Sequence, residues 1–226
     1  MSNVIIACDF SNKEELYLFL DKLGDRRPYL KIGMQIFYSE GPSLVEELKE
    51  KGFKIFLDLK LHDIPTTVHK AMKVIGLLNV DIVNLHAAGG IKMMREALSG
   101  LRSTNKETKL IAVTQLTSTT NDALREELLI KKPMDYTINH YAKNALIAGL
   151  DGVVCSPLEA PMMKDLDLIS VTPGIRFASN SNDDQVRVTT PAKAKELGST
   201  YIVVGRAITQ AKDPIYAYDR CVKEFQ

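Results

Sequence analysis

The stretch KIFLDLKLHDIPTTVHKAMKVIGLL, residues 54–78, joins a strand-like segment to a longer segment of helical period. Residues 54–60 are mostly apolar, interrupted by charges at Asp58 and Lys60, and such short apolar runs are typical of a parallel strand whose two faces are both covered. Residues 65–78 carry their apolar side chains at helical spacing. The stretch therefore predicts one β-strand followed by one α-helix.

This pattern recurs along the whole chain. Short runs rich in Val, Ile and Leu predict strands at residues 4–10, 29–34, 54–60, 81–87, 110–116, 152–156, 168–174 and 201–206. The intervening segments with helical period cover residues 11–24, 41–52, 65–78, 90–101 and 135–150. Ser11 followed by Glu14 predicts a capping box at the start of the first helix, and Gly24 predicts its end. The second helix is expected to begin at Pro42 and to end at Gly52.

Eight strands alternating with helices in a chain of 226 residues predict an α/β fold, the (β/α)8 barrel, with residues 1–226 forming a single domain. A doubly wound open sheet is the alternative. Such a sheet usually carries a glycine-rich GxGxxG turn after its first strand, whereas here that strand runs into CDFSNKEE. The pattern favours the barrel.

Bulk composition excludes several classes of protein. A formal net charge of +1 argues against a broad nucleic-acid surface, and no apolar run approaches the roughly 20 residues needed to cross a bilayer. The N-terminal MSNVIIACDF lacks the basic region and long apolar stretch of a secretory signal. The three cysteines, Cys8, Cys155 and Cys221, form no CxxC pair, which indicates reduced thiols in a cytoplasmic protein.

Polar residues gather where the predicted strands end, and barrel enzymes have their active sites at that end. The residues at or near these ends are Asp9, Lys31, Asp58, Lys60, Asp63, Asn84, His86, Thr114, Gln115, Thr117, Thr172, Pro173, Gly174, Arg176, Gly205 and Arg206. An aspartate or threonine at a strand end can also serve only as the N-cap of the next helix. That alternative stays open for Asp9 and for Asp63, each taken alone.

Lys31, Asp58 and Lys60 carry the strongest indication of a site. Lys31 lies inside an apolar strand, and Asp58 and Lys60 are two residues apart, so alternation directs both side chains to one face. A structural ion pair is the alternative, although charge networks in a cleft more often mark a functional site. By the same alternation His62 faces away from Lys60 and is expected to serve in packing. His86 is expected at most to support residues that contact the substrate.

The last two strands indicate a phosphate site. VVGRAIT, residues 203–209, reads as a strand, a glycine turn and a helix start, with Arg206 at the junction. Loops after strands seven and eight commonly hold phosphate in barrels. Residues 176–188 are polar and flanked by Arg176 and Gln185, which favours a lid hinged near Gly174 over a disordered surface loop.

Together these residues resemble a known family. DLKLHDIP, residues 58–65, matches the DxKxxD signature of the orotidine 5'-monophosphate decarboxylase superfamily. The resemblance covers essentially the whole chain. It includes LKIGM (30–34), NLHAAGG (84–90), AVTQLTS (112–118), VTPGIR (171–176) and IVVGRAI (202–208). DxKxxD alone is shared with sugar-phosphate aldolases and decarboxylases, whereas its combination with Lys31, TPGIR and VVGR is specific to the orotidylate enzymes.

The resemblance implies that the protein is a carboxy-lyase. It would form uridine 5'-monophosphate and CO2 in the last step of pyrimidine biosynthesis, without a metal or organic cofactor. It implies that Lys60 protonates C6 of the pyrimidine, that Asp58 lies beside the departing carboxylate, and that Lys31 and Asp9 bind the ribose. It further implies a homodimer. The remaining implied roles are Asp63 and Thr67 reaching in from the partner subunit, Thr117 and Pro173 against the pyrimidine, and Arg176, Gln185, Gly205 and Arg206 at the phosphate.

Two alternatives remain at this point. A sugar-phosphate decarboxylase or aldolase of the same superfamily would use Mg²⁺, and it usually places a metal-binding carboxylate where this chain has Lys31. An ammonium at that position would repel the cation. A non-catalytic barrel that binds a phosphorylated ligand is the other alternative, and the intact set of charges around Lys60 argues against it.

Overall fold

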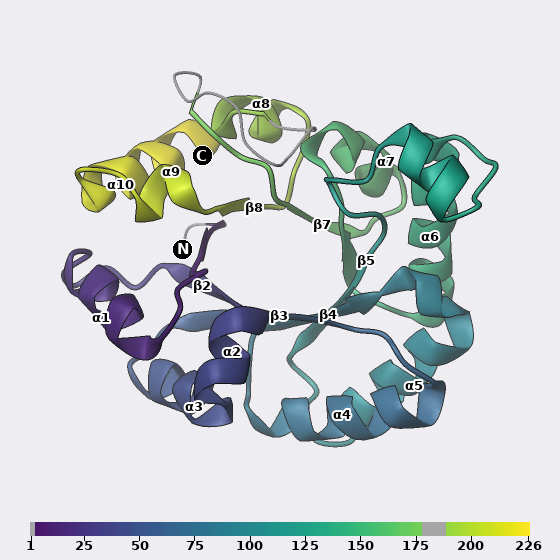
Figure 1. Ribbon diagram of the computed structural model, residues 1–226, viewed down its shortest axis with the longest axis horizontal. Helices are drawn as coiled ribbons and strands as arrows, with labels where there is room; N and C mark the ends of the chain where they lie inside the picture. The colour runs from purple at the N-terminus through teal and green to yellow at the C-terminus, as the bar shows by residue number, and fades with distance from the viewer. Residues whose placement is uncertain (1–2, 178–188) are drawn as a thin grey trace.

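Eight parallel strands close into a barrel in the computed structural model, which describes residues 3–177 and 189–226. Each strand pairs with its sequence neighbours, and pairing of β1 with β8 closes the ring, around which the helices lie (Figure 1). The strands are β1 Val4–Ala7, β2 Tyr29–Gly33, β3 Lys54–Leu61, β4 Ile82–His86, β5 Lys109–Val113, β6 Gly152–Val154, β7 Ile169–Thr172 and β8 Tyr201–Val204. The predicted (β/α)8 barrel is confirmed, and the open sheet is excluded.

The five predicted helices all form. The α-helices are α1 Lys13–Asp21, α2 Met34–Glu40, α3 Pro42–Glu50, α4 Pro65–Leu77, α5 Gly90–Arg102, α6 Met134–Ala148, α7 Ala160–Asp165, α8 Pro191–Glu196, α9 Arg206–Thr209 and α10 Pro214–Phe225. Short elements of other types are the 3₁₀ helices η1 Ala87–Gly89 and η3 Pro157–Glu159 and the π-helix η2 Ala123–Glu127. In the described part of the chain, no helix combines the length and apolar character needed to cross a membrane.

The predicted capping box of the first helix is wrong by one residue. The N-cap is Asn12, whose side chain accepts a hydrogen bond of 2.9 Å from the Glu15 backbone N–H. In return the Glu15 carboxylate accepts a bond of 3.2 Å from the Ser11 backbone N–H. Asn12 is an N-cap residue at least as good as Ser11, and the glutamate three residues beyond Asn12 is Glu15 rather than Glu14.

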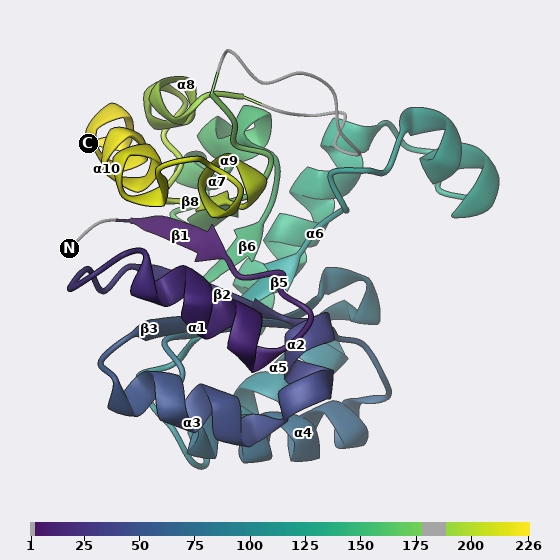
Figure 2. The same ribbon diagram turned by 60° about the vertical axis from the view of Figure 1, so that its left-hand side comes forward.

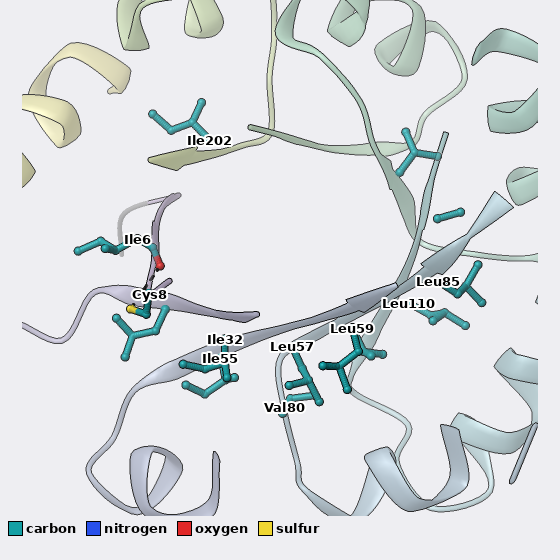
Figure 3. Close-up of a cluster of buried hydrophobic side chains, with 14 of the residues drawn as sticks. Ile6, Cys8, Ile32, Ile55, Leu57, Leu59, Val80, Leu85, Leu110 and Ile202 are labelled. Atoms are coloured by element: carbon teal, nitrogen blue, oxygen red, sulfur yellow. Dashed lines mark hydrogen bonds between the residues drawn. The ribbon is translucent and has the colours of Figure 1, made fainter. Parts of the chain in front are cut away.

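Two apolar layers hold the barrel together. Outward-facing side chains such as Ile6, Ile32 and Leu57 are fully buried and point toward the surrounding helices (Figure 3). Complete burial of a side chain of this size contributes about 1.5–3 kcal/mol relative to exposure. The inward-facing residues form a second cluster of Ile5, Ala7, Tyr29, Phe56, Ile82, Ile111, Val171 and Val203. This inner cluster fills the barrel interior as a packed core.

The inner cluster determines where polar side chains can reach the interior. Successive side chains on a strand alternate between its two faces. Positions two residues beyond Tyr29, Phe56 and Ile82 are therefore directed to the same face, toward the carboxyl end of the barrel. The chain's last helix, α10, packs against α8, α9 and β1 on the outside of the barrel (Figure 2).

Candidate active site

A cavity of about 1070 Å³ opens at the carboxyl ends of the strands. Its apolar lining includes the inward-facing residues Ala7, Phe56 and Val203, and charged side chains lie around it. Ligand pockets in proteins typically measure about 300–1,000 Å³, so this cavity has room for a nucleotide. The location is the one that barrel enzymes use.

Four charged side chains form a continuous row along this cavity, which we call the charge row: Asp9, Lys31, Asp58 and Lys60. The Lys31 ammonium lies 2.9 Å from Oδ1 of Asp9 and 3.3 Å from Oδ2 of Asp58. The Lys60 ammonium lies 2.7 Å from Oδ1 of Asp58. Positive and negative groups therefore alternate along the row, and each of the two central groups contacts a neighbour on both sides.

The row keeps its buried members ionised. Burial alone would raise the pKa of Asp58, but Lys31 and Lys60 outweigh it and hold that pKa below its usual value. Burial likewise would lower the pKa of Lys31, but Asp58 and then Asp9 raise it above its usual value. Both groups are therefore charged at neutral pH. Gly33 leaves the space that this requires, because a Cβ there would lie 3.2 Å from both Asp9 Oδ1 and Lys31 Nζ.

The structure brings Asp58 and Lys60 together, as expected, but regular strand alternation is only part of the reason. Lys60 has a φ of 51°, in the left-handed region that residues other than glycine rarely adopt. Such a conformation costs on the order of 1–3 kcal/mol and persists only where the surroundings impose it. A change of register between β3 and β4 at this point accompanies it.

Asn84 is among the polar residues listed at the strand ends, but the sequence indicated no role for it. It is fully buried, and its side chain hydrogen-bonds both to Asp58 and to the backbone of Lys60. A signal was available in the sequence, because an amide side chain interrupts the apolar run of residues 82–85. Buried amides need specific partners, and here the partners are charge-row residues.

The predicted phosphate end also lines the cavity. Of the residues predicted at the phosphate, Arg176, Gly205 and Arg206 line the cavity, and so do Thr117 and Pro173, which were predicted to lie against the pyrimidine. Backbone hydrogen bonds from Arg176 N to Thr189 O (2.9 Å) and from Thr189 N to Gly174 O (3.0 Å) join the two sides of the expected lid at its base. Gly174 has a φ of 82°, which suits glycine at such a hinge. Gln185 and lid residues 178–188 lie outside the described residues.

Asp63 and Thr67 are not brought to Lys60 within one chain. Both are exposed and lie outside the described lining of the cavity. Asp63 accepts a hydrogen bond of 2.6 Å from the Ile64 backbone N–H, just ahead of α4. The single chain thus places these two side chains at its surface, beyond the end of β3.

The histidines near the site differ in their surroundings. His62, expected to serve in packing, is exposed rather than buried, and its ring centre lies 5.7 Å from that of His86. Burial, and then the proximity of His62 and Lys60, lower the pKa of His86. His86 is therefore kept neutral beside the charge row. His62 was misjudged because β3 ends before it, so alternation no longer fixes its direction.

The described residues offer no reactive thiol pair and no metal-binding cluster. Cys8, Cys155 and Cys221 are all buried and free of disulfides. Burial raises the pKa of Cys221 to about 12, so its thiol is protonated at neutral pH. Among residues 3–177 and 189–226, no group of three or more His, Cys, Asp or Glu side chains is arranged to hold a metal ion.

The closed barrel and the charged cavity at the carboxyl ends of its strands define the class, a (β/α)8-barrel enzyme. More particularly, the chain belongs to the orotidine 5'-phosphate decarboxylase / HUMPS family, whose model matches residues 2–221. The resemblance carried by DLKLHDIP and its companion motifs is thereby confirmed.

Named relatives agree with this assignment. Orotidine 5'-phosphate decarboxylases of Staphylococcus aureus strains Mu3 and Newman are each 56% identical over 223 residues, covering 97% of this chain and 96% of the relative. The crystal structure of orotidine 5'-phosphate decarboxylase from Lactobacillus acidophilus has a TM-score of 0.90 and 42% identity, with 100% of both chains covered. An uncharacterized conserved protein from Geobacillus kaustophilus has a TM-score of 0.87 and 44% identity, covering 99% of this chain and 100% of its own.

Proposed function

We propose that this protein converts orotidine 5'-monophosphate to uridine 5'-monophosphate and CO2, the step that completes pyrimidine nucleotide synthesis, and that the charge row carries out the chemistry. The family and the relatives named above support the reaction. One observation carries the mechanism: the ammonium of Lys60 stands in the cavity, 2.7 Å from a carboxylate that Lys31 also contacts.

Lys60 is the proton donor in this proposal. Loss of CO2 from an sp² carbon leaves a carbanion at C6 with little resonance stabilisation, so the barrier is high. A fixed ammonium beside that carbon stabilises the developing negative charge and then delivers a proton to it. The C6–carboxylate bond breaks, its electron pair stays on C6, and that pair takes up the proton from Nζ of Lys60. No electron acceptor is required.

Asp58 and Lys31 organise this donor. The Asp58 carboxylate, ionised as its lowered pKa requires, holds the Lys60 ammonium at one oxygen and faces Lys31 with the other. In our proposal Asp58 lies beside the departing carboxylate of the substrate. Lys31 and Asp9 bind the ribose hydroxyls, and Thr117 and Pro173 lie against the pyrimidine. The cavity lining by these residues supports the assignment.

The phosphate is held at the other side of the cavity. Arg206, at the first position of α9, and Arg176, at the base of the expected lid, are assigned to it together with Gly205 and Gln185. Guanidinium groups suit phosphate because they donate paired hydrogen bonds. The phosphate takes no part in bond breaking, but its binding energy can drive closure of the site.

The proposal includes a second copy of the chain. Asp63 and Thr67 serve the active site of the partner in a homodimer, which accounts for two polar residues of the resemblance being exposed in the single chain. The intervening Ile64, with 66% of its surface exposed, is an apolar residue suited to such an interface.

Three buried cysteines without disulfides agree with a cytoplasmic location.

The test is direct. Purified protein is mixed with orotidine 5'-monophosphate and excess chelator, and the ultraviolet absorbance change is followed as uridine 5'-monophosphate forms. Conversion at a rate that the chelator does not change is the expected result. No conversion would overturn the proposed reaction. Conversion that stops with chelator and returns with Mg²⁺ would overturn the metal-free mechanism instead.

A further inference from the structure

Asn84 lies opposite an irregularity in β3. The register of the two strands changes on either side of it: Leu57 of β3 pairs with Val83, but Leu61 pairs with Leu85. Positions 58 to 60 of β3 thus face the single β4 position 84. Bulges of this kind interrupt the backbone ladder, re-aim side chains and are frequent beside active sites.

The side chain of Asn84 makes two hydrogen bonds at the bulge. Its Oδ1 accepts a bond of 2.8 Å from the backbone N–H of Lys60. Its Nδ2 donates a bond of 2.6 Å to Oδ1 of Asp58. Asn84 itself has no exposed surface, and its bond to Asp58 is buried while its bond to Lys60 is partly buried. One neutral amide thereby connects the backbone of Lys60 to the carboxylate of Asp58.

The two bonds act on the geometry that the mechanism needs. Lys60 stands in a left-handed backbone conformation, and the amide secures the N–H of that residue. Oδ1 of Asp58 receives both the Asn84 amide and the Lys60 ammonium, which leaves Oδ2 directed to Lys31. An acceptor in place of Nδ2 would repel the carboxylate, so the donor character of Asn84 matters as well as its shape.

We propose that Asn84 is a positioning residue for decarboxylation, which fixes the bulged backbone of Lys60 and the rotamer of Asp58 so that the ammonium is aimed at C6. The inference rests on the proposed roles of Lys60 and Asp58 and names a residue that acts only through them. A purely structural role would make a different prediction, namely lower stability with unchanged turnover per folded molecule.

Three variants separate these two roles: Asn84→Ala, Asn84→Asp and, as a matched control, Thr108→Val. Thr108 is buried and donates a single side-chain bond of 2.6 Å to Val80 O, before the start of β5 and away from the cavity. Sites are counted by titration with uridine 5'-monophosphate, so that activity is expressed per folded molecule. For both Asn84 variants we expect kcat to fall about 100-fold at neutral pH, the cost of a misplaced reacting group. The dissociation constant of uridine 5'-monophosphate should change less than about three-fold, because the phosphate end is untouched.

The pH profile supplies a second readout. The carboxyl introduced by Asn84→Asp accepts from Lys60 N in either protonation state but donates to Asp58 only when protonated. The kcat of Asn84→Asp, divided by that of wild type at the same pH, should therefore rise as the pH is lowered from about 8 to about 5. The same ratio for Asn84→Ala should not change with pH. Asn84→Asp nearly conserves the shape of the side chain, so it keeps the test available should Asn84→Ala not fold.

Unchanged kcat in the folded Asn84 variants would overturn the inference. An equal fall in the kcat of Thr108→Val would overturn it as well. A flat relative profile for Asn84→Asp would overturn the assigned role of the amide donor. Lys60→Ala is measured alongside, because it distinguishes failure of the role proposed for Asn84 from failure of the proposed mechanism. Turnover by Lys60→Ala would overturn both, whereas an inactive Lys60→Ala with fully active Asn84 variants would overturn the role of Asn84 alone.

Discussion

The Lys31 ammonium lies 3.3 Å from Oδ2 of Asp58, while Lys60 occupies the other oxygen of the same carboxylate at 2.7 Å. One buried carboxylate therefore holds two ammonium groups, and both are drawn into the cavity by it. Removing a charge from such a group leaves the others uncompensated in a low-dielectric site. Each member of the row should consequently affect the ionisation of its neighbours, which makes the arrangement testable by pH.

Lys31→Met should shift the acid limb of the pH profile of kcat/KM to higher pH. The charge of Lys31 lowers the pKa of Asp58, so its removal raises that pKa and Asp58 loses its charge at a higher pH. Lys49→Met is the matched control, because Lys49 makes an equally local ion pair of 2.7 Å with Asp81, just before the start of β4. An acid limb that stays in place for Lys31→Met would contradict the electrostatic coupling.

The stability of the wild-type protein should depend on the ionisation of Asp58 in acid. The pKa of Asp58 is lowered in the folded state, so its contribution is present above the unfolded value of about 4 and is lost as the pH falls through the folded pKa. The variant Asp58→Asn has no carboxylate at this position, so it cannot lose this contribution to stability in acid. The free energy of unfolding, measured by urea denaturation from about pH 6 downward, should therefore fall less steeply for Asp58→Asn than for wild type. Parallel slopes would show that Asp58 is not ionised as described.

Arg206→Ala should weaken binding of uridine 5'-monophosphate by roughly 10- to 100-fold, the range expected for a lost hydrogen bond to a charged group. Affinity for uridine, which lacks the phosphate, should not change. Calorimetric titration of both ligands into wild type and variant provides the comparison. Equal weakening of the two ligands would place Arg206 at the nucleoside, and unchanged affinities would remove it from the site.

Mixing two inactive variants tests the shared active site. If Asp63 completes the site of the partner, Lys60→Ala and Asp63→Ala chains together form heterodimers in which one site has both residues intact. Random exchange makes half of the dimers hetero, so activity should return to about a quarter of the wild-type level. Activity no greater than the sum of the separate variants would contradict a site built from two chains. Lys60→Ala mixed with Lys49→Ala is the control for mixing itself, because it should keep half of the wild-type activity whether or not the chains exchange.

The sequence predicted the barrel because period, strand count and chain length all reflect the same repeated βα unit. Lys31, Asp58 and Lys60 could also be placed, because a charge inside an apolar strand has few structural explanations. The left-handed backbone of Lys60 could not be predicted, since it depends on a register change between two strands that no local pattern reveals. Asn84 could be placed at a strand end but its role could not be predicted, because its partners are defined by that irregularity.

Local capping and quaternary structure set further limits. Ser11 and Asn12 are competing N-caps, and the choice depends on where the backbone enters α1 rather than on residue type. Asp63 and Thr67 are exposed in the single chain, so their proposed role depends on surfaces that one chain does not contain. Sequence pattern identifies residues within an element well, and it says little about relations between chains.

The central claim, that the Lys60 ammonium exchanges a proton with C6, is tested most directly with the product. By microscopic reversibility, the group that protonates C6 also removes that proton from bound uridine 5'-monophosphate. Wild-type protein in D2O should therefore replace the C6 hydrogen with deuterium, as followed by proton NMR. Lys60→Ala should bind the product with similar affinity yet exchange at least about 1,000-fold more slowly. Exchange by Lys60→Ala at the wild-type rate would contradict the claim.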